Sequence, residues 1–382
     1  MSDNDWSVLH LSTGHTGGAA IAARQLNAAL TRENFHSELF LLHKPGAMKG
    51  PKEFEVKRSA LNSGHAKIST ALNLMHGQPF FSLFSAPVKS SLLRSRMQQV
   101  DIIHIHNFYN FIDRSEMLAA LHGGKGLVVT LHDERFFTAG CHLSMTCLGF
   151  SHNCKPCPRS PRLLQTFLDD LQFFRREVTE IANPPLIICP SAWIYEKFRR
   201  SPLSDSCNAV IIPNVLESSS RDELQPRFQS SRITLGFASE LSNKLKGGVT
   251  SASLRDHFLK KNTGISLVTP RDYNFSMKHF WHAIDCLFLP TQMDNSPNVV
   301  IEAHLRGIPV LANDVGGVSE LVFDNFDICT HLDRTPMYLI ENFVRQLKSE
   351  YSFLAALKIA DKCLERIDEA FKAHLNVYSS RR

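Results

Sequence analysis

The sequence predicts an α/β protein with two domains, each a parallel sheet covered by helices on both faces. Short β-branched runs alternate with helical patterns from one end of the chain to the other. They give about ten strands, more than one sheet holds comfortably. A segment rich in serine, proline and charge, residues 212–228, separates two series of strands. The 382 residues are enough for two cores of ordinary size.

The first domain is expected to span residues 1–213. Its strands are predicted at Val8–Leu11, Glu38–Leu42, Ile102–His106, Leu127–Leu131 and Leu186–Cys189. Helices are predicted at Ala19–Thr31, Leu163–Ile181 and Ala192–Arg200. This alternation is typical of a Rossmann-like unit, in which ligands bind beyond the carboxyl ends of the strands.

The second domain is expected at residues 214–365. The second series of strands is predicted at Val210–Ile212, Thr234–Phe237, Ile265–Val268, Cys286–Leu289 and Val310–Ala312. Helices are predicted at Met277–Ala283 and Pro336–Lys348. A last helical pattern spans Tyr351–Tyr378. Residues 366–382 are expected to form a C-terminal helix that returns toward the first domain.

Composition and charge are those of a globular protein. The formal net charge of +5 is compatible with an anionic substrate or an anionic membrane surface and does not favour nucleic acid. The first residues show no signal region, and no apolar run approaches the ~20 residues of a spanning helix. We therefore expect a cytoplasmic protein whose nine cysteines are reduced thiols or metal ligands.

The most informative stretch follows a predicted strand and reads M-D-N-S-P-N-V-V-I-E-A-H-L-R-G-I-P-V-L-A-N-D-V-G-G, residues 293–317. Pro297 suits the first turn of a helix, where its missing N–H is no loss. The N–H groups of Asn298, Val299 and Val300 would then lie at a positive helix terminus. Such a terminus is a natural binding site for a diphosphate.

Two carboxylates flank this helix start. Asp294 lies on the preceding loop and can reach a sugar attached to the phosphate, while Glu302 lies one turn inside the helix and can bind a ribose diol. An acid for a sugar, amides for phosphates and an acid for ribose together describe a nucleotide-sugar site. The alternative is a helix start with ordinary capping acids.

Residues Ala303–Glu320, A-H-L-R-G-I-P-V-L-A-N-D-V-G-G-V-S-E, follow the pattern A-x-x-x-G-x-P-V-x-A-x-x-x-G-G-x-x-E. With the two carboxylates, the stretch resembles the E-x7-E donor motif of retaining glycosyltransferases of the GT-B fold, family four. It is most similar to the bacterial exopolysaccharide branch, such as colanic-acid glycosyltransferases. The resemblance implies two Rossmann-like domains with a cleft between them and no catalytic metal. It also implies hexose transfer from a UDP- or GDP-sugar to a growing, lipid-linked oligosaccharide in cell-surface polysaccharide synthesis.

By the same resemblance, His132 and Asp294 are the candidate catalytic residues. His132 ends an apolar strand in L-V-V-T-L-H-D-E and would position the reacting groups. Asp294 would hold the donor sugar, although the family has glutamate there. Asp133 is expected to orient or cap beside His132, and His106 and Asn107, at the end of another strand, are expected to line the acceptor side of the cleft.

Donor-binding residues are implied in both domains. Gly17 and Gly18 would let the loop after the first strand approach the donor phosphates, and the alternative is a plain strand-to-helix turn. Lys246, in E-L-S-N-K-L-K-G-G, would neutralise the diphosphate with Lys244 as its helper. The alternative is two surface lysines at a helix start, where the dipole disfavours them. Between Lys246 and Asp294 the chain is short by one α/β unit for this family.

A cysteine-rich insert, residues 141–157, follows the His-Asp pair. Its thiols are spaced C-x5-C-x6-C-x2-C, at Cys141, Cys147, Cys154 and Cys157. This spacing fits a structural zinc site, with His142 and His152 as reserve ligands. Loosely packed thiols and a redox role are the alternatives. Because the insert closely follows His132, we expect it to shape the acceptor side.

Residues Ser69–Val88 are apolar and aromatic and have Lys and Arg on both sides. They are expected to pack as core or to cover the acceptor cleft, and the alternative is contact with the inner membrane, where a lipid-linked acceptor lies. Other functions remain open for the whole chain. These are a non-catalytic protein that keeps the donor cleft, a nucleotide-sugar epimerase, and a zinc-bearing nucleic-acid module, which the modest charge disfavours.

Overall fold

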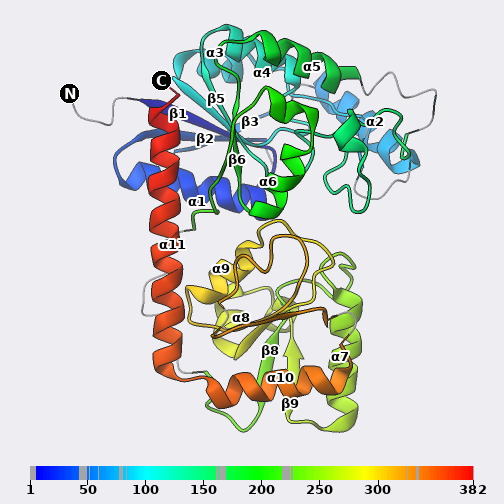
Figure 1. The fold of residues 1–382 in the computed structure, drawn as a ribbon, viewed down its shortest axis with the longest axis vertical. Helices are drawn as coiled ribbons and strands as arrows, with labels where there is room; N and C mark the ends of the chain where they lie inside the picture. The colour runs from blue at the N-terminus through cyan, green and yellow to red at the C-terminus, as the bar shows by residue number, and fades with distance from the viewer. Residues whose placement is uncertain are drawn as a thin grey trace. The chain divides into compact units, whose positions relative to one another are not determined.

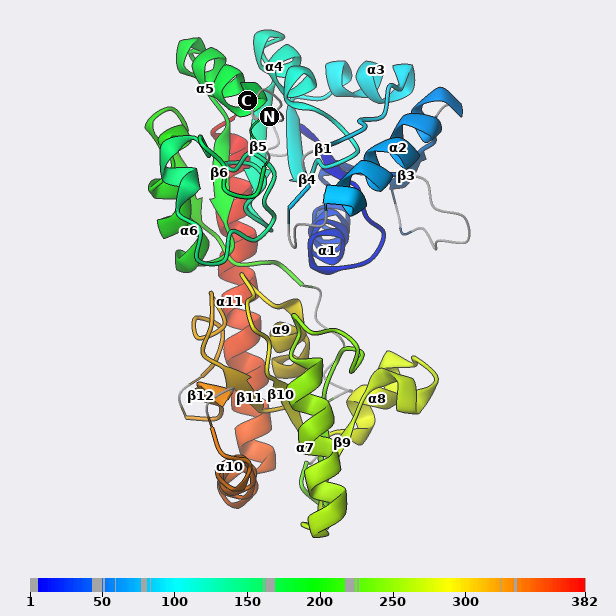
Figure 2. The same cartoon turned by 90° about the vertical axis from the view of Figure 1, so that its right-hand side faces the viewer.

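The computed structural model describes residues 6–42, 50, 52–58, 60–76, 81–82, 84–160, 162, 169–216, 224, 227–323, 325–332 and 335–381. The chain forms two compact units, residues 1–217 with 370–382 and residues 218–369. Each unit has its own parallel sheet with helices packed on it, as Figures 1 and 2 show. The predicted fold class is confirmed. The predicted linker, residues 212–228, lies partly outside the described residues.

The first unit holds a seven-stranded sheet in the order β3-β2-β1-β4-β5-β6-β7. Its strands are β1 (Ser7–Ser12), β2 (His36–Leu42), β3 (Glu53–Val56), β4 (Ile102–Asn107), β5 (Gly126–Thr130), β6 (Leu186–Cys189) and β7 (Ala209–Ile211). The five strands predicted for this domain are confirmed to within about two residues at each end. Val210–Ile212, predicted as the first strand of the second series, is instead β7 of this sheet. The edge strand β3 was not predicted.

Helices cover both faces of this sheet. They are α1 (Gly18–Arg32), α2 (Ala60–His76), α3 (Ser91–Gln99), α4 (Arg114–His122), α5 (Asp169–Glu180) and α6 (Ala192–Arg199). Apolar side chains of α3, α4, α5 and α6 form the main core with one face of the sheet. On the other face, Ala23 of α1 packs against Leu39 and Leu41 of β2. The first residues of the predicted helix Leu163–Ile181, 163–168, lie outside the described residues.

Histidines alternate with core residues in β1 and β4. Leu9 and Leu11 of β1 and Ile103 and Ile105 of β4 lie in the main core. The side chains that alternate with them, His10, His104 and His106, therefore point to the opposite face. The parallel register pairs His10 with His104. Tyr378, near the end of α11 (Phe353–Ser379), packs against them there. The result is a buried polar layer beneath the last helix of the chain.

The second unit holds a five-stranded sheet in the order β12-β11-β10-β8-β9. Its strands are β8 (Ile233–Gly236), β9 (Ile265–Val268), β10 (Cys286–Leu289), β11 (Val310–Asn313) and β12 (Ile328–Thr330). Its helices are α7 (Gly248–Lys261), α8 (Met277–Ala283), α9 (Asn298–His304) and α10 (Met337–Glu350). Between the lysine-rich loop and α8, residues 248–276, β9 is the only strand, as the short sequence there predicts. The edge strand β12 was not predicted.

Candidate functional site

In the second unit, the loop between β10 and α9 carries the first predicted donor acid. The carboxylate of Asp294 forms an ion pair with Nζ of Lys246. The main-chain oxygen of Asp294 accepts a hydrogen bond from the N–H of Gly317 at 3.0 Å. Lys244 is exposed. The structure therefore brings Lys246 and Asp294 together and leaves Lys244 at the surface.

Two glycines allow this close approach of chain segments. Gly247 has φ of 84°, and a Cβ on it would lie 2.0 Å from the main-chain oxygen of Pro290. Gly316 has φ of 62°, and a Cβ on it would lie 1.9 Å from the main-chain oxygen of Asp294. Both positions exclude a side chain by conformation and by space. The loop that holds Asp294 is thus fixed by backbone packing on two sides.

Helix α9 begins at Asn298, with Pro297 as its N-cap. Asn298 is buried and Val299 is half-buried. The N–H of Val300 donates to the main-chain oxygen of Pro297 at 3.0 Å. The prediction that this third amide is available for a phosphate is therefore wrong, because the first turn of the helix uses it.

The second predicted donor acid, Glu302, lines a pocket of this unit together with Arg227, Trp281 and Arg306. Nη1 of Arg306 donates to the main-chain oxygen of Glu302 at 2.7 Å, and its guanidinium lies 5.3 Å from the centre of the Trp281 ring. Burial raises the pKa of the Glu302 carboxyl, and the charge of Arg306 opposes this rise. A half-buried carboxylate beside an aromatic ring is well placed to accept hydrogen bonds from a hydroxylated ligand.

In the first unit, His132 follows β5 at the carboxyl end of the sheet. Its Nε2 lies 3.1 Å from Nδ1 of His106, and Nε2 of His106 lies 3.0 Å from Nδ1 of His10. Burial lowers the pKa of His132 to about 3. His106 is buried, with both ring nitrogens next to other histidines. The structure thus joins His106 to His132, and His10, which was not singled out in the sequence, is the third member.

The other predicted acceptor-side residues organise the adjacent loops. Oδ1 of Asn107 accepts a hydrogen bond from the N–H of Tyr109 at 3.1 Å. Oδ1 of Asp133 accepts one from the N–H of Arg135 at 2.9 Å, and burial raises the pKa of the Asp133 carboxyl. Both side chains therefore hold the turns that follow their strands, and the orienting or capping role of Asp133 beside His132 stays a prediction.

The turn between β1 and α1 exposes backbone at two glycines. Gly17 has φ of 91° and is the N-cap of α1, and Gly18 is the first residue of the helix. A Cβ on either glycine would meet no heavy atom of the described residues within 4 Å. In contrast to Gly247, packing does not require these glycines, so space remains for another group beside them.

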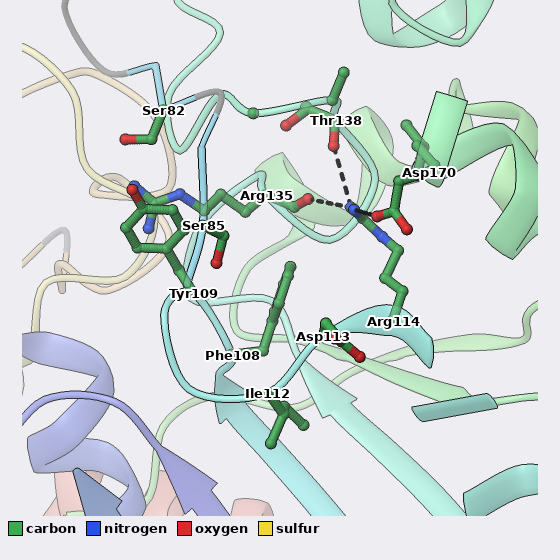
Figure 3. A pocket seen from close by; sticks show the side chains of 13 residues that line it. Ser82, Ser85, Phe108, Tyr109, Ile112, Asp113, Arg114, Arg135, Thr138 and Asp170 are labelled. Carbon is green, nitrogen blue, oxygen red and sulfur yellow. Dashed lines mark hydrogen bonds and ion pairs between the residues drawn. The ribbon is translucent and has the colours of Figure 1, made fainter. Parts of the chain in front are cut away.

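A pocket lies beside the loops that follow β4 and β5 (Figure 3). Within it, the guanidinium of Arg135 stacks 4.0 Å from the centre of the Tyr109 ring. Ser82 and Ser85 line the same pocket. On the opposite wall, Arg114 forms an ion pair with Asp170 at 2.7 Å. This pocket was not predicted from the sequence. Its signals were an arginine three residues after His132 and two serines in the aromatic segment.

The apolar segment Ser69–Val88 divides into two parts. Residues 77–80 and 83 lie outside the described residues. Before this gap, α2 has exposed apolar side chains at Ile68 (58%), Leu72 (38%) and Met75 (83%), which share one face of the helix. After it, Phe81 forms a β-bridge with Cys141. Described residues of the second part pack against the insert and line the pocket.

The cysteine-rich insert packs beside this pocket. Cys141, Cys154 and Cys157 are buried, and Cys147 is half-buried. The sulfur of Cys147 accepts a hydrogen bond from the N–H of Gly149, and that of Cys154 accepts one from the N–H of Ala139, both at 3.4 Å. Burial raises the pKa of the Cys141 thiol to about 12 and that of Cys154 to about 11.

Metal-ligand spacing distinguishes the insert from the histidines. His10, His104 and His106 place potential metal-ligand atoms within 4.8 Å of one another, and they are the one such group of three or more in the described ranges. The four cysteine sulfurs do not form such a group. Two histidines were predicted as reserve ligands. Nδ1 of His142 lies 3.1 Å from Nη2 of Arg135, and His152 is exposed.

A buried ion pair, also missed in the sequence, anchors the loop after β5. Glu134 is fully buried, and its carboxylate pairs with Nζ of Lys197 on α6 at 2.7 Å. It also accepts a hydrogen bond from the N–H of Ser144 at 2.9 Å. A buried carboxylate requires such partners. Glu134 therefore ties the loop that bears His132 to the insert and to α6.

The two Rossmann-like sheets place the chain in the GT-B fold class, and solved structures agree. HepE of Anabaena, in complex with UDP and glucose, has a TM-score of 0.61 and 13% identity over 98% of this chain and 100% of that chain. A TarM variant of S. aureus, in complex with fondaparinux, alpha-GlcNAc-glycerol and UDP, has a TM-score of 0.61 and 10% identity over 98% and 99%. WaaG, a glycosyltransferase involved in lipopolysaccharide biosynthesis, has a TM-score of 0.54 and 12% identity over 94% and 95%. At these identities the likeness shows the fold.

The sequence itself shows the family. The model of Glycosyltransferase Family 4 matches residues 16–219, more than half of the chain. The protein belongs to this family and is a glycosyltransferase. No curated protein matches the sequence. None of the helices in the described residues is long and apolar enough to cross a membrane.

Proposed function

We propose that the protein is a retaining hexosyltransferase of the exopolysaccharide, colanic-acid type branch. It moves a hexose from a UDP- or GDP-sugar to a growing, lipid-linked oligosaccharide in cell-surface polysaccharide synthesis. The main observation in favour of donor binding is the ion pair of Lys246 with Asp294, on a loop fixed by glycines. Glu302 lies one turn inside the helix that follows this loop. HepE has been solved with UDP-glucose and TarM with UDP, which supports UDP as the nucleotide.

The chemistry of the donor site follows from these charges. A bound diphosphate would exchange the ion pair of Lys246 with Asp294 for one with phosphate. The released carboxylate could then accept hydrogen bonds from sugar hydroxyls, and the ammonium would stabilise the charge of the leaving group. We expect no catalytic metal, because Lys246 and the amides of Asn298 and Val299 can take this role. In the first unit, Gly17 and Gly18 are the proposed phosphate contacts, since a Cβ on either would meet no heavy atom of the described residues within 4 Å.

On the acceptor side, His132 would position the reacting groups at the carboxyl end of the first sheet. The pocket of Arg135, Ser82 and Ser85 offers a cation and hydroxyls to an oligosaccharide, and Tyr109 holds the arginine in place. The exposed apolar face of α2 supports peripheral contact with the inner face of the cytoplasmic membrane, where a lipid-linked acceptor lies. A structural zinc ion in the insert is part of the proposal, supported by three buried cysteines and two N–H···S contacts.

The donor half predicts a change in thermal stability. The melting temperature of the full chain should rise with UDP or one UDP-hexose and should not rise with ADP. A ligand at 100 times its Kd stabilises by about 2.7 kcal/mol. Glu302→Ala should remove most of this rise, because the ribose diol loses its acceptor. The measurement is a thermal-shift screen with UDP, GDP, ADP and their hexose conjugates.

Glu365→Ala, an exposed glutamate on α11, is the matched control and should keep the full rise. No rise with any nucleotide would overturn the donor site. Binding without hexose transfer or donor hydrolysis would favour a non-catalytic protein that keeps the donor cleft. Interconversion of free nucleotide-sugars in the absence of acceptor would identify an epimerase.

A further inference from the structure

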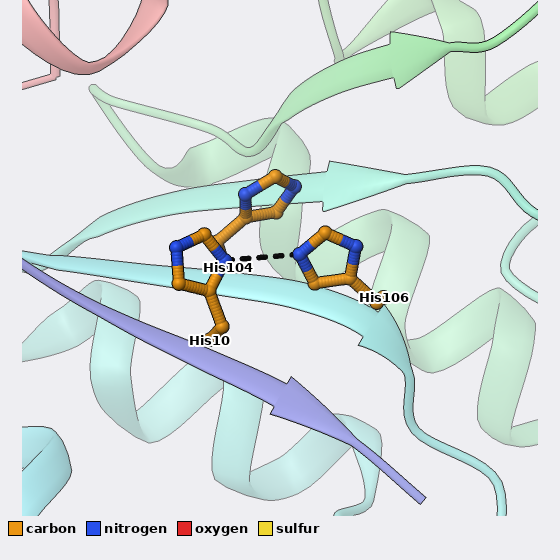
Figure 4. Close-up of side chains that lie close together, drawn as sticks. All are labelled: His10, His104 and His106. Atoms are coloured by element: carbon orange, nitrogen blue, oxygen red, sulfur yellow. Dashed lines mark hydrogen bonds between the residues drawn. The ribbon is translucent and has the colours of Figure 1, made fainter. Parts of the chain in front are cut away.

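Three histidines of the first unit form a continuous chain of ring contacts. Nδ1 of His10 lies 3.0 Å from Nε2 of His106, and Nδ1 of His106 lies 3.1 Å from Nε2 of His132. Figure 4 shows the first of these contacts, between side chains that come from the adjacent strands β1 and β4. The chain runs from the centre of the sheet to the predicted reacting histidine at its carboxyl end.

All three imidazoles are neutral at physiological pH. Burial lowers the pKa of His10 and of His132 to about 3 and that of His106 well below 6.5. The neighbouring His374 lowers these values further, and His104 lowers that of His106. Each ring therefore carries one proton, on one of its two nitrogens.

The fourth ring, His104, is engaged elsewhere. Its Nδ1 lies 2.7 Å from the hydroxyl of Tyr378 and its Nε2 lies 2.7 Å from Oγ1 of Thr130. A metal ion shared with His10 and His106 would break one of these hydrogen bonds. The contacts therefore describe a hydrogen-bonded chain better than a metal site.

Proton counting leaves two arrangements for the chain, because each N···N contact holds one hydrogen. In the first, Nδ1–H of His10 donates to His106 and Nδ1–H of His106 donates to Nε2 of His132. In the second arrangement, Nε2–H of His132 donates to Nδ1 of His106 and Nε2–H of His106 donates to Nδ1 of His10. The proton of His10 then lies on its Nε2. Within the described residues Nε2 of His10 is buried and has no hydrogen-bond partner. Because buried N–H groups are left unpaired less often than acceptors, the first arrangement is favoured.

We propose that His106 and His10 are positioning residues that hold His132 in its Nδ1–H tautomer. Nε2 of His132 accepts the hydrogen bond of His106, so the single proton of the neutral His132 ring lies on Nδ1. This role rests on the proposed function of His132. His106 then acts through His132 and does not itself contact the acceptor.

The tautomer can be measured without activity by NMR of the full chain labelled with [15N]histidine. His132 should show a protonated Nδ1 and an unprotonated Nε2, although free histidine in water favours the reverse. In His106→Phe, which removes the donor, His132 should return to the Nε2–H form. In His106→Asn, the amide Nδ2 lies where the imidazole Nδ1 lay and can donate in its place, so the Nδ1–H form should be restored.

Kinetics then separate the two proposals. If the transfer reaction is confirmed, His106→Phe should lower kcat on the order of 10-fold to 100-fold with little change in the KM of the donor, and His106→Asn should recover most of it. A wild-type His132 that carries its proton on Nε2, is positively charged at neutral pH, or keeps its tautomer in a folded His106→Phe protein would overturn the inference. Intact tautomer shifts without transfer would leave the chain standing and reject the proposed function.

Discussion

Single residues were predictable where they lie in a motif at the end of a strand. Asp294, Glu302 and Lys246 were singled out because each lies in a distinctive stretch, and the structure places Asp294 beside Lys246, while their role in donor binding stays a prediction. His10 could not be found in this way. A lone histidine between two leucines is typical of a structural residue, and its partner lies 96 residues away. Their contact depends on the pairing of β1 with β4, which no local pattern reveals.

Buried strands were predicted from the sequence more accurately than edge strands. The strands β5, β6 and β10 are buried along their whole length and were found with nearly correct bounds. The two missed strands, Glu53–Val56 and Ile328–Thr330, are three or four residues long and lie at sheet edges. The first alternates glutamates with apolar residues, and edge strands are commonly short and charged. Their pairing comes from the neighbouring strand and not from their own sequence.

For the cysteine-rich insert, the testable prediction is that the protein binds zinc there. Purified protein should contain close to one zinc ion per chain if the four cysteines bind it, since the N–H···S contacts of Cys147 and Cys154 suit a thiolate site. Cys157→Ser should lose the metal and lower the melting temperature. Elemental analysis and a thermal scan measure the two effects. Cys329→Ser, on β12 of the other unit, should change neither. A folded Cys157→Ser protein that keeps its zinc contradicts the site.

Helix α2 is an element whose exposed face predicts membrane contact. Full-length protein should sediment with vesicles that contain anionic lipid, because Ile68, Leu72 and Met75 can insert side by side. Replacing Leu72 and Met75 together by glutamine should reduce the bound fraction severalfold, given ~25 cal/mol per Å² of apolar surface. Leu259→Gln, also exposed but on α7, is the control. Equal sedimentation of all three proteins would reject α2 as the contact.

At the scale of the molecule, the two strand series predicted two units, and the last helix links them in sequence. Residues 370–382, which include the end of α11, belong to the first unit. There Tyr378 packs against His10 and Trp6. The sequence predicts that a final helix exists, but the histidines it covers are revealed only by the sheet register. This covering layer gives the whole first unit a pH dependence.

We expect the first unit to lose stability as pH falls from about 7 to about 4.5. His10, His106, His132 and His374 are neutral in the folded state because burial lowers each pKa, with that of His374 at about 4 against 6.5 for a free histidine. Below 6.5 the unfolded chain binds more protons than the folded one, so acid favours unfolding. Each histidine contributes at most about 1.4 kcal/mol per pH unit. Urea unfolding at several pH values, followed by the fluorescence of the buried Trp6, measures the loss.

His374→Leu tests the cause, since it removes one of these groups from the covered layer. Between pH 6 and pH 4.5, unfolding of the variant should take up about one proton fewer than unfolding of the wild type. Its unfolding free energy should therefore fall less steeply with acid, by about 1.4 kcal/mol per pH unit. His65→Gln changes an exposed histidine on α2 and should keep the wild-type slope. If His374→Leu and wild type share one slope, or if stability is flat between pH 7 and pH 5, the layer is not neutral in the folded protein. That result would also remove the proton count on which the tautomer of His132 depends.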